Sequence, residues 1–143
     1  MALWDVIRGG GARSLAVFGM AKNAGKTVAL NHLAGRAGRE RVVLGLTSIG
    51  RDGEAWDVLT HRRKPSIRAE AGTLIATAEA CLEVGTAGFE PLEDTGIATP
   101  LGPVHVVRVR RPGRVELAGP SRGEQLRRIV GRHLGLGAEL VLV

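Results

Sequence analysis

The first third of the chain alternates aliphatic runs with a helical pattern. Residues 14–19 form an apolar run typical of a buried strand, apolar positions then recur at helical spacing from Thr27 to about Gly38, and residues 41–48 form a second aliphatic run. A short helix is predicted over residues 2–8, ahead of a glycine run. Strand, loop, helix and strand make a βαβ unit, so we expect the sheet to begin with parallel strands.

The middle of the chain favours strands. We expect a short strand near residues 73–76 and a helix from about Thr77. Apolar positions then alternate through residues 104–117, in two runs separated by Pro112-Gly113. Because Pro-Gly is a turn signal, the two runs predict a β-hairpin or meander.

The end of the chain predicts a capped helix followed by a buried strand. Ser121 and Glu124 have the spacing of a capping box, and glycines at 135 and 137 supply the stop. The apolar stripe of this helix consists of Leu126, Ile129, Val130 and Leu134. Residues 138–143 then read as an aliphatic strand.

Composition narrows the fold class to a single α/β domain over residues 1–143. The chain is 44% hydrophobic but only 3% aromatic, and it contains 21 glycines, so its core must be aliphatic. Together with the element order this predicts a three-layer sandwich with a mainly parallel sheet plus a β-hairpin or meander. No apolar window is long enough for a membrane span and no signal peptide is recognised, so we expect a cytoplasmic protein without membrane contact.

Cysteine and histidine give no sign of a metal site. Cys81 is the only cysteine, and no Cys/His cluster has metal-ligand spacing. The four histidines are isolated and are predicted to lie at the surface or on helix faces: His32, His61, His105 and His133.

The formal net charge of +6 raises the question of nucleic-acid binding. All but three of the 20 basic residues are arginine, and they are scattered. The densest clusters, at residues 62–64 and 108–114, have no aromatic side chains among them that could stack on bases. Nucleic acid is therefore an unfavoured partner, although an Arg-rich nucleic-acid binder stays open as an alternative.

A Gly-Lys-Thr triplet stands at the predicted strand-to-helix junction, in the stretch GMAKNAGKTV. Glycines let backbone N–H groups approach phosphates, and the N-terminus of the following helix favours an anion. In this interpretation Gly25 gives a tight turn, Lys26 reaches the terminal phosphates and Thr27 places its hydroxyl on Mg²⁺. The alternative is an incidental glycine turn. The predicted contacts to ATP, or another nucleoside triphosphate, are Gly19, Ala21, Lys22, Asn23, Ala24, Gly25, Lys26, Thr27 and Val28.

A magnesium nucleotide also needs a carboxylate. Our first choice is Asp52, within Arg-Asp-Gly after the second aliphatic run. We expect Thr27 and Asp52 to be the metal ligands, and Lys26 and Asp52 to be the catalytic residues. The alternative reading is an ordinary Asp-Gly turn. A second acid is expected after the strand at 138–143, but the sequence stops at Val143. We therefore expect either a C-terminally truncated piece or an incomplete Mg²⁺ shell, with nucleotide binding rather than hydrolysis by this chain alone.

The spacing of the loop resembles a particular branch of P-loop proteins. One residue more separates Gly19 from Gly25 than the common form allows, as in the loops of dethiobiotin synthetase and the cobyrinic acid amidating enzymes. Met20 takes the place of their threonine. In many members of this branch a signature lysine stands five residues before the P-loop lysine and reaches across a dimer. Here that position holds Ala21, and Lys22 stands four residues before Lys26. The dimer-crossing role is therefore not assigned to Lys22.

Over nearly its whole length the chain resembles the reactivase small subunit of lysine 5,6-aminomutase, a bacterial P-loop family. The pieces that carry the resemblance are KNAGKT, LTSIGRDGE, GTLIATAE, TGIATPLGPV and GAELVLV. It implies an ATP-binding subunit that works with a MutS-like ATPase subunit to remove damaged cobalamin from an adenosylcobalamin-dependent aminomutase. The alternative from the loop alone is an ATP-dependent carboxylate ligase of the dethiobiotin synthetase type.

Overall fold

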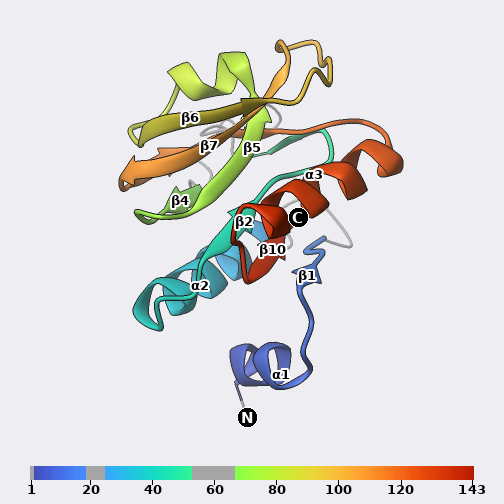
Figure 1. Ribbon diagram of the computed structural model, residues 1–143. Helices are drawn as coiled ribbons and strands as arrows, with labels where there is room; N and C mark the ends of the chain where they lie inside the picture. The colour runs from blue at the N-terminus through green and yellow to red at the C-terminus, as the bar shows by residue number, and fades with distance from the viewer. Residues whose placement is uncertain (1, 19–24, 53–66) are drawn as a thin grey trace.

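The computed structural model describes residues 2–18, 25–52 and 67–143, with only the backbone of residues 51 and 52. Its main feature is a six-stranded sheet in the order β1-β10-β2-β5-β7-β6 (Figure 1). The strands of this sheet are β1 (Ser14–Leu15), β2 (Leu44–Leu46), β5 (Leu74–Ala78), β6 (Gly88–Asp94), β7 (Val104–Arg111) and β10 (Leu140–Leu142). The first four in spatial order are parallel, and β7 and β6 are added as an antiparallel hairpin.

Two short antiparallel pairs complete the strands. One joins β3 (Arg51–Asp52) to β9 (Leu117–Ala118), and the other joins β4 (Ile67–Ala69) to β8 (Gly113–Val115). The helices are α1 (Leu3–Gly9), α2 (Lys26–Arg39), the 3₁₀ helix η1 (Glu79–Glu83) and α3 (Gly123–Gly135).

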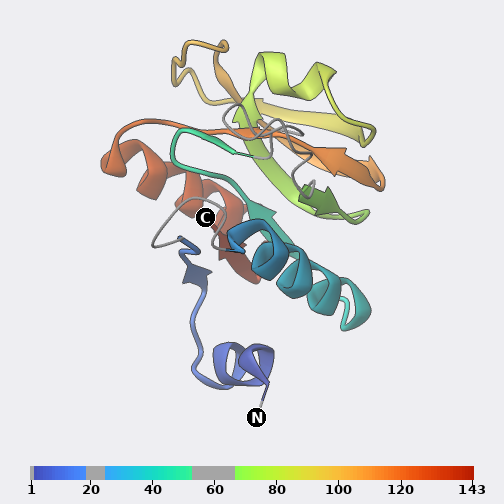
Figure 2. The same cartoon turned by 180° about the vertical axis from the view of Figure 1, so that it is seen from behind.

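Helices α2 and α3 cover opposite faces of the parallel strands, as the two views show (Figures 1 and 2). The alternation along β10 explains this arrangement: Leu140 and Leu142 pack in the cluster that contains the apolar face of α2, and Val141 packs with the α3 side. All three side chains are buried. The prediction of an α/β chain with a mainly parallel sheet is confirmed, and the layering is that of a three-layer sandwich.

Helix α1 is attached to the α2 side of the molecule through Trp4. Its indole lies in the main core cluster, and Nε1 donates a 2.5 Å hydrogen bond to the Glu40 carboxylate. That bond holds the pKa of the Glu40 carboxyl below its usual range, and the nearby Arg36 guanidinium contributes a smaller lowering. The predicted short N-terminal helix is therefore present and is anchored just beyond the last turn of α2.

Helix α2 ends in a Schellman motif that carries an arginine where glycine is usual. The amide of Val42 donates to the Ala37 carbonyl at 2.8 Å, and the amide of Arg41 donates to Gly38 at 3.3 Å. Arg41 has a φ of 56°, in the left-handed region. An L-residue with a side chain loses roughly 1 kcal/mol there, so position 41 is strained.

The predicted hairpin across Pro112-Gly113 is wrong. Strand β7 has β5 on one edge and β6 on the other, so no edge remains for β8, which pairs with β4 instead. The hairpin partner of β7 is β6, which the sequence pattern did not predict. Register shifts on both sides of residues 89–91 and a proline at 91 interrupt the alternation that would have indicated this strand.

The helix predicted from Thr77 is also wrong, because β5 continues to Ala78 and only the short η1 follows. The Thr77 hydroxyl donates to the Glu116 carbonyl at 3.1 Å and accepts the Ala118 amide at 2.9 Å. These bonds tie the end of β5 to β9 and hold Thr77 in extended backbone.

The capping box predicted for α3 does not form. The N-cap is Arg122, with no side-chain hydrogen bond to the first turn, so Ser121 stands one residue too early. Glu124 lies 3.6 Å from Arg122 instead, measured from Oε1 to Nη1. The apolar stripe is as predicted, with Ile129 buried and Leu126, Val130 and Leu134 partly buried.

His133 lies on a face of helix α3, one of the two placements predicted for the histidines, and that face is fully buried against β2. A Cβ at Gly45 would lie 2.7 Å from His133 Cγ, so the glycine makes room for the ring. His133 Nε2 lies 3.1 Å from the Leu46 carbonyl oxygen, to which it donates, while Nδ1 is buried without a hydrogen-bond partner among the described residues. Burial lowers the pKa of His133 to about 4.

This shift predicts a specific loss of stability in mild acid. The unfolded chain protonates this histidine near its ordinary pKa of 6.5, whereas the folded chain does so only near 4, so stability falls as the pH drops through that window. Between about pH 7 and pH 5 we expect the free energy of unfolding to fall by roughly 2 kcal/mol from this group. Urea denaturation at both pH values measures the change.

The matched variant is His133→Gln, whose amide nitrogen can still donate to Leu46 but does not titrate. We expect the fall between the two pH values to shrink by most of that amount. An equal fall in both proteins would show that another group is responsible.

Candidate functional site

The carboxyl ends of the four parallel strands meet at one edge of the sheet, at Leu15, Ala78, Leu142 and Leu46. Helix α2 connects β1 to the parallel strand β2 and therefore begins at this edge. Between β1 and β2 lies β10, so the connection passes over one strand. In open α/β sheets, ligands bind outside the carboxyl ends of the strands where the strand order changes.

The first turn of α2 places Gly25, Lys26 and Thr27 at this edge. Gly25 is the N-cap residue, with φ of 85° and ψ of 16°, and its carbonyl accepts the first helical bond from Ala29 at 2.9 Å. Among the described residues, a Cβ at this position would meet nothing within 4 Å, and the left-handed backbone is what calls for glycine here. Lys26 and Thr27 are half-buried and Val28 is 59% exposed.

This turn fits an anion on two counts. The N-terminal amides of α2 donate no hydrogen bond to a side chain of the cap residue, because that residue is glycine, and the helix dipole favours negative charge at this end. The other predicted contacts, Gly19, Ala21, Lys22, Asn23 and Ala24, lie outside the described residues.

Asp52 lies in β3, where its backbone pairs with Leu117 of β9. The residue thus belongs to a short strand that follows the end of β2. Its side chain is outside the description, so its role as a Mg²⁺ ligand stays a prediction.

A contact that sequence reasoning missed fixes the segment leading to Asp52. A Cβ at Gly119 would lie 1.7 Å from the Ser48 carbonyl oxygen, so the two backbones touch. The Gly119 amide donates to Gly50 at 2.9 Å, and the Gly50 amide donates to Pro120 at 3.2 Å. The Ser48 hydroxyl donates to the Gly50 carbonyl at 2.6 Å. Residues 48–52 are therefore held along residues 117–120.

Although the chain has a positive net charge, several of its arginines form ion pairs with acids or hydrogen bonds with backbone carbonyls. Arg108 and Arg110 both form ion pairs with Glu90, and Arg132 binds Glu93 with a closest distance of 2.5 Å. Arg128 donates to the Thr95 carbonyl at 2.8 Å. In the described part of the 108–114 cluster, positive charge is thus partly neutralised within the molecule. The cluster at 62–64 lies outside the described residues.

The described ranges contain neither a metal-binding cluster nor a membrane-spanning helix. No group of three or more His, Cys, Asp or Glu side chains there could hold a metal ion. Within the same ranges, no helix is long and apolar enough to cross a membrane.

The chain matches no family model, no curated protein and no solved structure.

The Ser48–Gly119 contact gives a direct test of the architecture beside the site. Gly119→Ala should lower the free energy of unfolding by at least about 3 kcal/mol, because the methyl group must displace backbone rather than a flexible side chain. The matched control is Gly131→Ala, within α3, where a Cβ meets nothing within 4 Å. That change should raise stability by about 0.5–1 kcal/mol. Urea denaturation of both variants measures the two changes in the free energy of unfolding. Equal changes in the two variants would contradict the contact.

Proposed function

We propose that this chain binds ATP, or another nucleoside triphosphate, with Mg²⁺ at residues 19–28. The observation that carries the proposal is the left-handed Gly25 at the start of α2, directly followed by Lys26 and Thr27, at the carboxyl edge of a parallel sheet. A phosphate group at this place would meet backbone amides, a helix N-terminus and an ammonium group together.

Each residue then has a distinct task. Lys26 neutralises the terminal phosphates, Thr27 supplies a hydroxyl ligand for Mg²⁺, and the amides of the first turn of α2 hold phosphate oxygens. Asp52 is the proposed acidic ligand. Bound Mg²⁺ would offset the negative charge of the phosphates.

We further propose that the chain is the nucleotide-binding subunit of a reactivase. It would act with a MutS-like ATPase subunit to release damaged cobalamin from an adenosylcobalamin-dependent lysine aminomutase. This role rests on the sequence resemblance. Its physical requirement is a segment whose position depends on the bound nucleotide, since a ligand shifts an equilibrium only through its different affinity for two states. Residues 47–57, which follow the carboxyl end of β2, are our candidate for that segment, and the structure describes residues 47–52 of it.

Lys26→Ala tests nucleotide binding. Isothermal titration calorimetry with ATP and Mg²⁺ should show binding to the wild type and an affinity at least about 100-fold lower in the variant, a loss of roughly 3 kcal/mol. The matched control is Arg39→Ala, which removes a cation from the other end of the same helix and should keep the wild-type affinity. Equal binding by wild type and Lys26→Ala, with unchanged circular dichroism, would contradict the proposed site.

Reactivation assays test the partner role separately. An inactivated lysine 5,6-aminomutase is mixed with its MutS-like ATPase subunit and ATP, and release of damaged cobalamin is followed by absorbance. Addition of the wild-type chain should speed release, whereas Lys26→Ala should not. If ATP binds normally but release is not accelerated, the nucleotide site stands and the reactivase role does not.

A further inference from the structure

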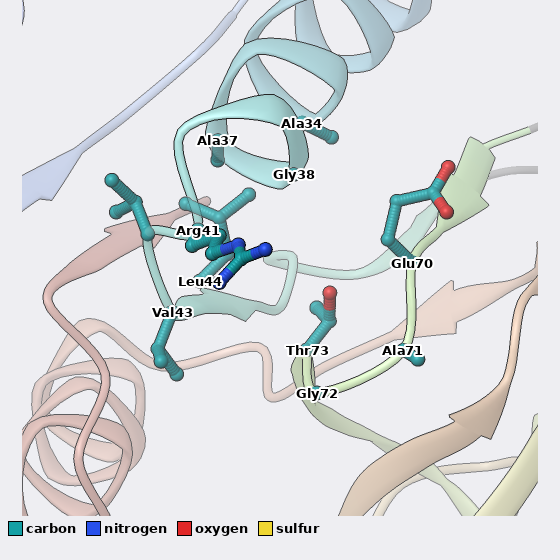
Figure 3. Close-up of a pocket in the computed structure, with 11 residues that line it drawn as sticks. Ala34, Ala37, Gly38, Arg41, Val43, Leu44, Glu70, Ala71, Gly72 and Thr73 are labelled. Atoms are coloured by element: carbon teal, nitrogen blue, oxygen red, sulfur yellow. The ribbon is translucent and has the colours of Figure 1, made fainter.

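A hollow of about 230 Å³ lies at the amino edge of β2 and β5, beneath the last turn of α2 (Figure 3). Its walls come from the end of α2, the connection into β2 and the turn between β4 and β5. Lys26 stands at the other end of α2, and a helix of this length spans roughly 20 Å. The hollow is therefore separate from the proposed nucleotide site.

Arg41 forms one side of this hollow, and its guanidinium reaches toward the interior in Figure 3. The residue is held at a φ of 56°, where glycine would be unstrained. Arg41 is exposed to solvent, and no ion pair among the described residues includes it. A strained backbone that keeps a charged side chain at a hollow is the kind of outlier that points to function.

The opposite side carries Glu70 and Thr73. Glu70 Oε1 lies 3.7 Å from Arg68 Nε, so its carboxylate has only one loose partner. A Cβ at Gly38 would lie 3.2 Å from Glu70 Cγ, so the absence of a side chain at Gly38 keeps space beside Glu70. Figure 3 shows the Thr73 hydroxyl directed into the hollow.

The remaining wall is apolar, with Ala34, Ala37 and Leu44 all buried. The C-terminal end of a helix also favours positive charge, because its carbonyls carry partial negative charge. The hollow therefore offers a cation for a carboxylate, an acid and a helix C-terminus for an ammonium group, and small side chains for a short aliphatic group.

We propose that this hollow binds a small zwitterion, an α-amino acid with a short aliphatic side chain. Its carboxylate pairs with the Arg41 guanidinium, which matches carboxylate geometry with two donors. Its ammonium group faces Glu70 and Thr73, and its side chain lies against Ala34 and Ala37. A volume of about 230 Å³ corresponds to roughly eight waters, so the ligand has fewer than about ten non-hydrogen atoms. We expect an affinity of about 1 mM or weaker.

The test uses L-valine as the probe, with isobutyrate and isobutylamine as controls that each keep one of its charges. Backbone amide shifts are followed by NMR at increasing ligand concentration. We expect saturable shifts with valine at Ala37, Arg41 and Thr73, and at least about tenfold weaker binding of either control.

Arg41→Gly is the decisive variant, because it removes the guanidinium while relieving the backbone. Its melting temperature should rise by about 3 °C, and its affinity for valine should fall at least about tenfold. Arg39→Ala removes a neighbouring cation and should bind valine as the wild type does. Lys26→Ala should also keep valine binding, which separates this site from the proposed nucleotide site.

Three results would overturn the proposal. They are the absence of saturable shifts with valine up to about 50 mM, equal binding of valine by Arg41→Gly and wild type, and equal binding of isobutyrate and valine.

Discussion

The parallel half of the molecule depends on strand β10. This strand lies between β1 and β2, and its three side chains are buried on both faces of the sheet. Among the described strands β1 pairs with β10 alone, and the pairing continues beyond β1, where the Val17 amide donates to Val143 at 2.8 Å. The position from which the chain enters the glycine-rich loop is therefore set by β10. Burial of each such Leu or Val stabilises the fold by roughly 1.5–3 kcal/mol.

The same strand links the candidate site to the segment on its other side. The Thr47 amide donates to Leu142 at 3.1 Å, so the exit from β2 is held by β10 as well. Beyond it, residues 48–52 lie along residues 117–120, which lead directly into α3, and His133 of α3 contacts the Leu46 carbonyl in turn. These contacts form a closed loop of neighbouring groups. Residues 47–52 are therefore connected to α3 by two routes, the backbone of residues 117–120 and the side chain of His133.

Elements with regular apolar spacing could be predicted from the sequence, and those defined by distant partners could not. Helix α2, β2 and β10 follow from local periodicity, because their buried faces are aliphatic. The pairing of β8 with β4 depends instead on β7 having both edges occupied, which no local window contains. The burial of His133 likewise depends on a glycine in another element, Gly45.

The candidate site shows the same division. The Gly-Lys-Thr triplet at the strand-to-helix junction is visible in the sequence because its residue types are contiguous. The contact between Ser48 and Gly119 is not visible, because nothing near Gly119 indicates that backbone will approach it. The strained Arg41 is also hidden, since arginine gives no sign of a left-handed conformation.

The switch of the sheet from parallel to antiparallel at β5 and β7 has a consequence for how the chain folds. Strands β6 and β7 are neighbours in sequence and pair across a short connection, so they can form early with little loss of chain entropy. Ser14, by contrast, pairs with Val141, near the opposite end of the described chain. During synthesis the β6–β7 hairpin can therefore form before β10 has been synthesised, when β1 still lacks its pairing partner. In that interval the aliphatic residues of the parallel half are exposed to chaperones and to other chains.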